Sequence, residues 1–326
     1  MIKTIGSKIL SNNIPSTHGG DGWQKRTKSC INELQEGKIW HKSFCNSEIN
    51  ELNEVILTVP HEKIFYNKNP KENLFFDNVN GKKLIQQTNE LIKIYENNNI
   101  KVHKLELSHD NPYPNLLFLR DLFWPTPQGV ILCRPASMQR SGEERFIAEK
   151  LSEIGIPVTM HIRGTGLFEG ADALWLNNET VLIGTGFRTN NEGADQIKNF
   201  LSEIGVKTIK VKLERGVQHL LGILNFLTKD TVTINYKKAS NELLKIIQDF
   251  GFNIVKLFDE KEIDKNKGMN FVNLGNNKIL MPKGTINLIS IYKSFGLEIL
   301  EADISEYLKA AGGIGCCTGV IYRKNN

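Results

Sequence analysis

The chain has 326 residues, of which 40% are hydrophobic and 24% charged, and its formal net charge is +5, which is ordinary for a globular protein. It has no apolar run of about 18 residues and no block of basic residues, so we expect neither a membrane span nor a nucleic-acid-binding arm. Its first residues lack the apolar core of a signal peptide, which predicts a cytoplasmic protein.

The five cysteines are irregularly spaced and do not form the pattern of a disulfide framework. They are Cys30, Cys45, Cys133, Cys316 and Cys317. We therefore expect reduced thiols. No C-x-x-C pair occurs, and no group of cysteines and histidines has the spacing of a structural zinc site, so we expect no metal and no cofactor.

The first part of the chain differs from the rest. Residues 1–50 are rich in Gly, Asn, Ser and Lys and are predicted to form an N-terminal extension that lies over the next segment or is partly disordered. Residues 51–326 are predicted to form a single domain. At its start, residues 54–60 are predicted to form a strand, residues 82–96 a helix, and residues 100–102 a returning strand.

A repeat of about 45 to 50 residues organises the remainder of the chain. Each copy has two short β-rich runs joined by a turn, then apolar residues at helical spacing, then a further β-rich run. Glycine, which suits a helix C-cap, closes each predicted helix. The copies span residues 121–160, 172–211, 222–257 and 269–302, and the closing glycines are Gly155, Gly205, Gly251 and Gly296.

With the weaker first copy, the unit is ββαβ and occurs five times. Repeats that cannot bury their apolar faces alone must stack on one another. The sequence therefore predicts an α/β fold in which five ββαβ units close into a propeller-like ring with the helices outside. Polar residues at matching points of the repeat should then gather at the centre.

Several candidate catalytic residues occupy such points. Cys316 lies among glycines, which would let a substrate approach closely, and a cysteine nucleophile reacts as its thiolate. The alternative for Cys316 is a structural cysteine on a C-terminal strand. His219 precedes an apolar run and could transfer protons near neutral pH; the alternative is a hydrogen-bonded core histidine.

Charged residues at comparable points are candidates for substrate binding. Glu169 and Asp172 precede a buried strand, where a cationic guanidinium would be a suitable partner. Asp121 could serve in the same way, or could pair with its neighbour Arg120. Arg140 and Arg188 occupy equivalent loops and could hold a substrate carboxylate, although each could also be a surface arginine.

Four segments, in order, resemble motifs of the guanidino-group-modifying superfamily, which has the pentein fold. They are Pro114-Asn115-Leu116-Leu117-Phe118-Leu119-Arg120-Asp121, Glu169-Gly170-Ala171-Asp172, Arg188-Thr189-Asn190 and the glycine-rich stretch Gly312–Thr318. The resemblance covers residues 52–323 and includes arginine deiminases, dimethylarginine dimethylaminohydrolases and amidinotransferases. It implies the same five-bladed fold.

The resemblance also implies roles for the candidate residues. Cys316 corresponds to the nucleophile, His219 and Glu169 to the catalytic histidine and acid, and Asp121 to the carboxylate that binds the guanidinium. The residues that correspond to groups holding the amino-acid end are Asn115, Arg140 and Arg188, and Asp172 joins the substrate-binding set. One departure is Leu221, where arginine deiminases carry aspartate and dimethylaminohydrolases do not.

The predicted activity is therefore hydrolysis of a guanidino C–N bond in arginine or a substituted arginine, through a covalent thiouronium intermediate. The expected partner is a small guanidino or ureido amino acid, and self-association into a homo-oligomer stays open. One alternative is amidinotransfer, in which an amine captures the same intermediate. Another is a non-catalytic binding protein, because a fold does not fix a function.

Overall fold

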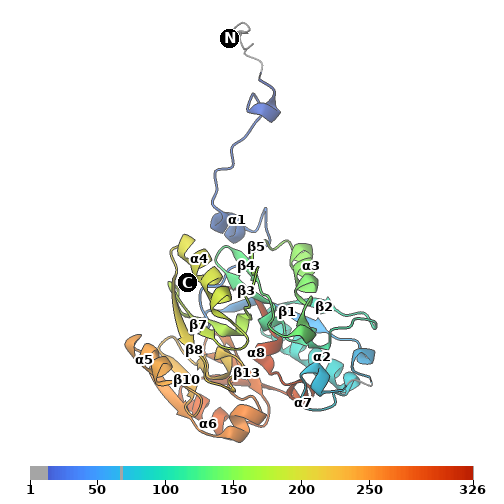
Figure 1. Cartoon of the computed structure of the whole chain (residues 1–326), viewed down its shortest axis with the longest axis vertical. Coiled ribbons are helices and arrows are strands. Elements are labelled where there is room, and N and C mark those ends of the chain that lie inside the picture. The colour runs from blue at the N-terminus through green and yellow to red at the C-terminus, as the bar shows by residue number, and fades with distance from the viewer. Residues whose placement is uncertain (1–13, 67–68, 326) are drawn as a thin grey trace.

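The computed structural model describes residues 14–66 and 69–325 of the chain. Five separate three-stranded sheets follow one another around a common centre, with helices on the periphery (Figure 1). The predicted five-bladed α/β propeller is confirmed. Among the described residues, no helix combines the length and the apolar character needed to cross a membrane.

Four blades are built from consecutive segments, each with an antiparallel strand pair, a helix and a parallel third strand. Their elements are β3 (Phe123–Thr126), β4 (Gly129–Leu132), α3 (Glu144–Ile154) and β5 (Val158–His161); β6 (Ala173–Asn177), β7 (Thr180–Thr185), α4 (Asn191–Glu203) and β8 (Lys207–Lys212); β9 (Leu224–Phe226), β10 (Thr231–Asn235), α5 (Asn241–Asp249) and β11 (Asn253–Leu257); and β12 (Val272–Gly275), β13 (Lys278–Pro282), α6 (Ile286–Ser294) and β14 (Glu298–Ala302).

The first blade takes one strand from each end of the domain. It contains β1 (Leu52–Val59), α2 (Gly81–Asn97) and β2 (Lys101–Glu106), and β15 (Gly319–Arg323) pairs antiparallel with β1. The first copy looked weak in the sequence because β15, which takes the place that β3 has in the next blade, lies at the far end of the chain. This pairing closes the ring.

Local chemistry explains the repeated unit. The closing glycines Gly155, Gly205, Gly251 and Gly296 all have positive φ, between 76° and 88°, which an L side chain rarely adopts. The helices are amphipathic: α3, for example, buries Ile147 and Leu151 against its blade.

The segment before the propeller includes α1 (Cys30–Glu36), and residues 14–29 extend away from the body (Figure 1). Residues 41–45 lie against the propeller. The His41 N–H donates to the carbonyl of Gly155, and the carbonyl of Phe44 accepts from the Arg323 N–H. Phe44 and Cys45 are buried, so this stretch packs on the ring.

Three blades begin with an equivalent short 3-10 turn. These turns are Leu119–Asp121, Gly170–Asp172 and Leu220–Gly222, and each immediately precedes the first strand of its blade. The first two turns contact each other, and the second contacts the third. The repeat therefore places polar residues from distant parts of the sequence side by side.

Candidate active site

The adjacent turns bring His219 together with two carboxylates. The Nε2 atom of His219 lies 2.6 Å from Oε2 of Glu169 and 3.9 Å from Oδ1 of Asp121. All three side chains are buried. The structure thus brings together, in one cluster, three residues of which each is about 50 positions from the next in the chain.

Cys316 lies on α8 (Ile314–Cys317), a single helical turn before β15, so the segment is not the extended strand of the structural alternative. Its backbone N–H donates to Oδ1 of Asn270 at 3.0 Å, and the Gly315 N–H donates to the Asn270 carbonyl at 3.1 Å. A Cβ added to Gly313 would lie 2.6 Å from Asn270 Oδ1. The glycines therefore let the Cys316 segment pack closely against Asn270.

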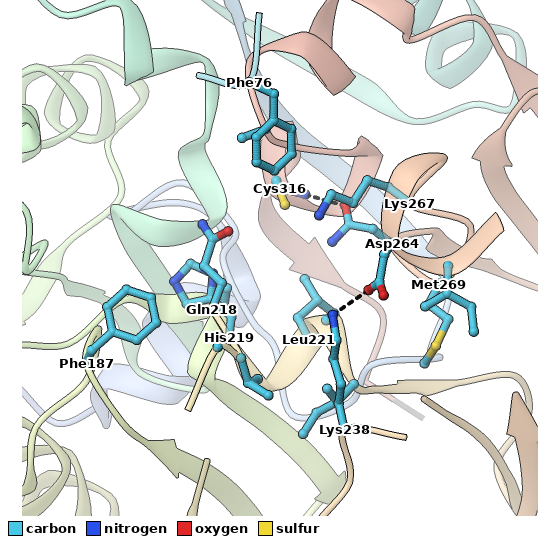
Figure 2. A pocket seen from close by; sticks show the side chains of 18 residues that line it. Phe76, Phe187, Gln218, His219, Leu221, Lys238, Asp264, Lys267, Met269 and Cys316 are labelled. Carbon is cyan, nitrogen blue, oxygen red and sulfur yellow. Dashed lines mark hydrogen bonds and ion pairs between the residues drawn. The ribbon is translucent and has the colours of Figure 1, made fainter. Parts of the chain in front are cut away.

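Cys316 and His219 line the same cavity, which has a volume of about 370 Å³. Figure 2 shows them on its wall with the aromatic rings of Phe76 and Phe187 and with Lys267. A cavity of this size, largely apolar and carrying a few polar groups, suits an amino-acid-sized ligand.

The charges around His219 keep its imidazole protonated. Burial opposes the charged form, but Asp121, Asp172 and Glu169 together raise the pKa of His219 to about 9. Burial likewise opposes ionisation of Glu169, yet the hydrogen bond and charge of His219, aided by Arg188, lower the pKa of Glu169 to about 2. At neutral pH the pair is an imidazolium and a carboxylate.

The Cys316 thiol is held in its protonated form. Burial and the charge of Asp121 raise its pKa, while a backbone hydrogen bond, the charge of Lys267 and Asn270 act in the opposite direction. A thiolate is the reactive species, so a further positive charge in the cavity would be needed to favour it. Oδ1 of Asp121 is buried and has no hydrogen-bond partner among the described residues.

Arg140 faces the protein rather than the cavity. Its Nη1 lies 2.5 Å from Oδ2 of Asp121, its Nε donates to Glu143 at 2.9 Å, and its Nη2 donates to the carbonyls of Asn115 and Phe118. Arg140 is 2% exposed, so it is no surface arginine, and its donors are used within the chain. From this position the Arg140 guanidinium can hold the Asp121 carboxylate in a fixed orientation.

Arg188 also pairs inside the site. Its Nη1 lies 3.2 Å from both Glu169 oxygens, and its guanidinium stacks on Phe187. Its side chain keeps an exposed fraction of 11%. Arg120, the neighbour of Asp121, does not pair with it but with Glu48. The arginine that pairs with Asp121 is Arg140.

Asp172 and Asn115 are buried and bonded to the protein. Asp172 accepts from the Thr189 hydroxyl at 2.6 Å and from the Leu220 N–H at 2.9 Å. The Asn115 amide donates to the carbonyl of Asn73. Asp172 therefore joins the turn of Glu169 to the turn of His219, and neither side chain is directed into the cavity by these bonds.

Several residues of the site had no sequence signal. Asn270 and Lys267 lie in a loop before β12, at the start of the fourth repeat, and Phe76 lies in the loop before α2. Glu143, the second partner of Arg140, is equally unmarked. Only the positions of Asn270 and Lys267, just before the strand of the fourth repeat, match those of the other site residues.

The chain resembles known proteins over most of its length. A family model described as arginine deiminase matches residues 44–250. The N(G),N(G)-dimethylarginine dimethylaminohydrolase of Pseudomonas aeruginosa is 26% identical over 234 residues, which cover 72% of this chain and 87% of that protein.

Solved structures share the fold. A dimethylarginine dimethylaminohydrolase of Pseudomonas aeruginosa complexed with citrulline superposes with a TM-score of 0.69 at 23% identity, over 83% of this chain and 100% of that one. SxtG, an amidinotransferase from Microseira wollei, superposes with a TM-score of 0.70 at 16% identity, over 87% of this chain and 98% of that one.

Proposed function

We propose that this chain, which belongs to the arginine deiminase family within the guanidino-group-modifying pentein superfamily, hydrolyses a C–N bond of an arginine-like guanidino group. Cys316 would be the nucleophile. The observation that carries the proposal is the buried Oδ1 of Asp121, which has no hydrogen-bond partner in the part of the chain that the structure describes and lies 3.9 Å from Nε2 of His219. A buried carboxylate oxygen is costly without a donor, and a guanidinium supplies planar N–H donors.

The first half of the reaction forms the covalent intermediate. The bound guanidinium pairs with Asp121 and favours the Cys316 thiolate through its positive charge. The sulfur adds to the central guanidinium carbon, which forms a C–S bond. His219, protonated because of its raised pKa, gives its proton to the departing nitrogen as the C–N bond breaks. An amine or ammonia leaves, and a thiouronium remains on Cys316.

The second half releases the product. His219, now neutral, takes a proton from a water molecule as that oxygen attacks the thiouronium carbon. The C–S bond then breaks, which regenerates the Cys316 thiolate and leaves a neutral ureido group on the product. His219 has become imidazolium again with the first water proton, and the second water proton is released to solvent. Splitting one difficult substitution into two easier steps is the advantage of covalent catalysis. The steps need no cofactor.

The contacts of Arg140 change the proposed binding of the amino-acid end. Because its donors are bonded to Asp121, Glu143 and two carbonyls, we assign Arg140 a positioning role. Arg188 is tied to Glu169. Lys267 lines the cavity beside Cys316 (Figure 2), and we assign it the substrate carboxylate.

A substrate screen tests the reaction class. The protein would be incubated with arginine and N-methylated arginines, with and without glycine as an amine acceptor, and Cys316→Ser would be the control. Hydrolysis gives a ureido product and an amine or ammonia whether or not glycine is present. Formation of ornithine and a new guanidino compound only with glycine would establish amidinotransfer instead. If no guanidino compound is consumed, the proposed activity is wrong.

A further inference from the structure

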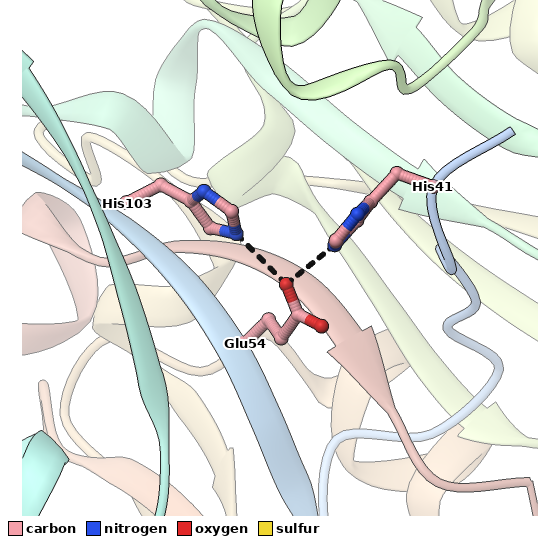
Figure 3. A group of neighbouring side chains, drawn as sticks. All are labelled: His41, Glu54 and His103. Carbon is pink, nitrogen blue, oxygen red and sulfur yellow. Dashed lines mark hydrogen bonds and ion pairs between the residues drawn. The ribbon is translucent and has the colours of Figure 1, made fainter. Parts of the chain in front are cut away.

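A second cluster of titratable side chains lies outside the catalytic cavity. Nε2 of His41 lies 2.7 Å and Nε2 of His103 lies 2.8 Å from the same oxygen, Oε2 of Glu54 (Figure 3). The two rings are perpendicular, with centroids 5.5 Å apart. None of the three residues lines the cavity that holds Cys316.

Three separate segments supply this cluster. Glu54 lies on β1, His103 lies on the parallel neighbour β2, and His41 comes from the segment before the propeller. The register between β1 and β15 shifts on both sides of Glu54, and such β-bulges re-aim side chains. The His41 N–H is fixed to the carbonyl of Gly155, at the end of α3.

Three nitrogen-bearing side chains approach one carboxylate oxygen of Glu54, whereas an ordinary ion pair has one. Nε2 of both histidines, and Nζ of Lys101 at 3.6 Å, approach Oε2, whereas Oε1 of Glu54 has no hydrogen-bonded side chain among the described residues. Two imidazole nitrogens and one carboxylate oxygen therefore point at nearly one spot.

We propose that His41, Glu54 and His103 bind one divalent transition-metal ion of the zinc type. Two imidazole nitrogens and one carboxylate oxygen are a common three-ligand set for Zn²⁺, with water in the fourth position. Bonds of about 2.0–2.1 Å in a tetrahedron place ligand atoms about 3.3 Å apart. The present separations of 2.7 and 2.8 Å would need to open by only about half an ångström.

The charge and exposure of the cluster suit this ion. Imidazoles that bind a metal are neutral, so two of them with one carboxylate contribute a net charge of −1, and a divalent ion gives the occupied site a net charge of +1. The side chains of His41, Glu54 and His103 are 25%, 14% and 13% exposed, so an ion can enter from solvent. Soft or nitrogen ligands favour zinc over magnesium or calcium, which prefer oxygen.

Binding would fasten the N-terminal segment to the blade that closes the ring. The His41 N–H is bonded to the carbonyl of Gly155 in the second blade, and Glu54 lies on β1, the strand with which β15 pairs. One ion would therefore connect the N-terminal segment, β1 and β2. Since ions that bind only the folded state stabilise it, zinc should raise the melting temperature without entering the reaction.

Zinc binding to the metal-free full chain tests the proposal. Isothermal titration with ZnCl₂ would be carried out on the wild type and on His41→Gln and His103→Gln, with MgCl₂ as the ion control. We expect one tight zinc equivalent in the wild type and at least a tenfold loss of affinity in each variant. Magnesium should not compete.

The catalytic cluster provides the matched control, because Asp121, Glu169 and His219 also lie within reach of one ion. His219→Asn should keep the tight equivalent and the zinc-induced rise in melting temperature, while His41→Gln and His103→Gln should lose both. Absence of zinc binding in the wild type, or loss of binding in His219→Asn alone, would overturn the proposal.

Lys101 supplies a test that spares the ligands. Its Nζ lies 3.6 Å from Oε2 of Glu54 and its side chain is 57% exposed. Removing this positive charge with Lys101→Gln should tighten zinc binding roughly fivefold, as expected for like charges near 4 Å in water. Unchanged or weaker binding in this variant would place the ion elsewhere and overturn the assignment.

Discussion

Replacing Glu169 with Gln should both slow turnover and change how stability depends on pH. The side chain is fully buried and bonds to His219, Arg188 and the N–H of Ala136. Glutamine has nearly the same shape but carries no charge. His219 would keep only Asp121 and Asp172 as anionic neighbours, so the pKa of its imidazole should fall from about 9 toward its ordinary value.

The magnitude follows from the two pKa values of His219. A rise from 6.5 to about 9 corresponds to about 3 kcal/mol of stabilisation, shared among the three carboxylates. Because the folded pKa is raised, this stabilisation is complete below about pH 6.5 and is lost as pH rises through about 9. The lowered pKa of Glu169 describes the same ion pair, so its energy is counted once. Losing a buried pair with Arg188 adds to the cost.

We therefore expect Glu169→Gln to destabilise the protein by about 3 kcal/mol at pH 7. The difference from the wild type should narrow by about 1 kcal/mol or more by pH 9.5, because His219 of the wild type is then losing its proton and the stabilisation that depends on it. Urea denaturation at the two pH values measures this. An equal difference in the free energy of unfolding at both pH values would refute the ion pair between Glu169 and His219. In a separate measurement, the alkaline limb of the kcat/KM profile should move to lower pH in the variant.

Three further variants test neighbouring parts of the site. Cys317 is buried and its thiol donates to the Ile314 carbonyl. Cys317→Ala should therefore keep turnover and lose about 1–2 kcal/mol of stability in urea denaturation. A folded but inactive variant would contradict the assignment of the nucleophile to Cys316. Arg140→Lys should destabilise the fold by about 3–5 kcal/mol, because one ammonium cannot replace the guanidinium fork, and a cost within 0.5 kcal/mol of zero would refute its positioning role. Lys267→Met should slow alkylation of Cys316 by iodoacetamide and raise KM for carboxylate-bearing substrates, and equal rates and KM would remove Lys267 from the site.

Much of the architecture could be predicted from the sequence because turn residues and glycines mark where the strands and helices of each repeat begin and end. In the four consecutive copies, each predicted helix is followed by a glycine whose positive φ the structure shows, and a predicted hairpin precedes each helix. The partner of β1 could not be predicted, since β15 lies more than 250 residues away and its pattern belongs to no complete copy. Pairing of chain ends is a tertiary property.

The gathering of His219, Glu169 and Asp121 followed from their matching places in the repeat. The direction of Arg140 did not, because a loop position cannot tell whether its side chain turns outward or toward Asp121 and Glu143. The histidine–glutamate cluster was hidden for a related reason. Residues 41, 54 and 103 have no metal-site spacing, and only the pairing of β1 with β2 and the packing of the N-terminal segment bring them together.

The central claim is that the sulfur of Cys316 becomes covalently attached to the substrate carbon during turnover. Acid quenching of the reacting protein, followed by digestion and tandem mass spectrometry, tests it directly. We predict a mass increase that equals the substrate less its departing amine, on the sulfur of Cys316, present in Cys317→Ala and absent in Cys316→Ser. Turnover by Cys316→Ser, or an adduct on Cys317, would contradict the account.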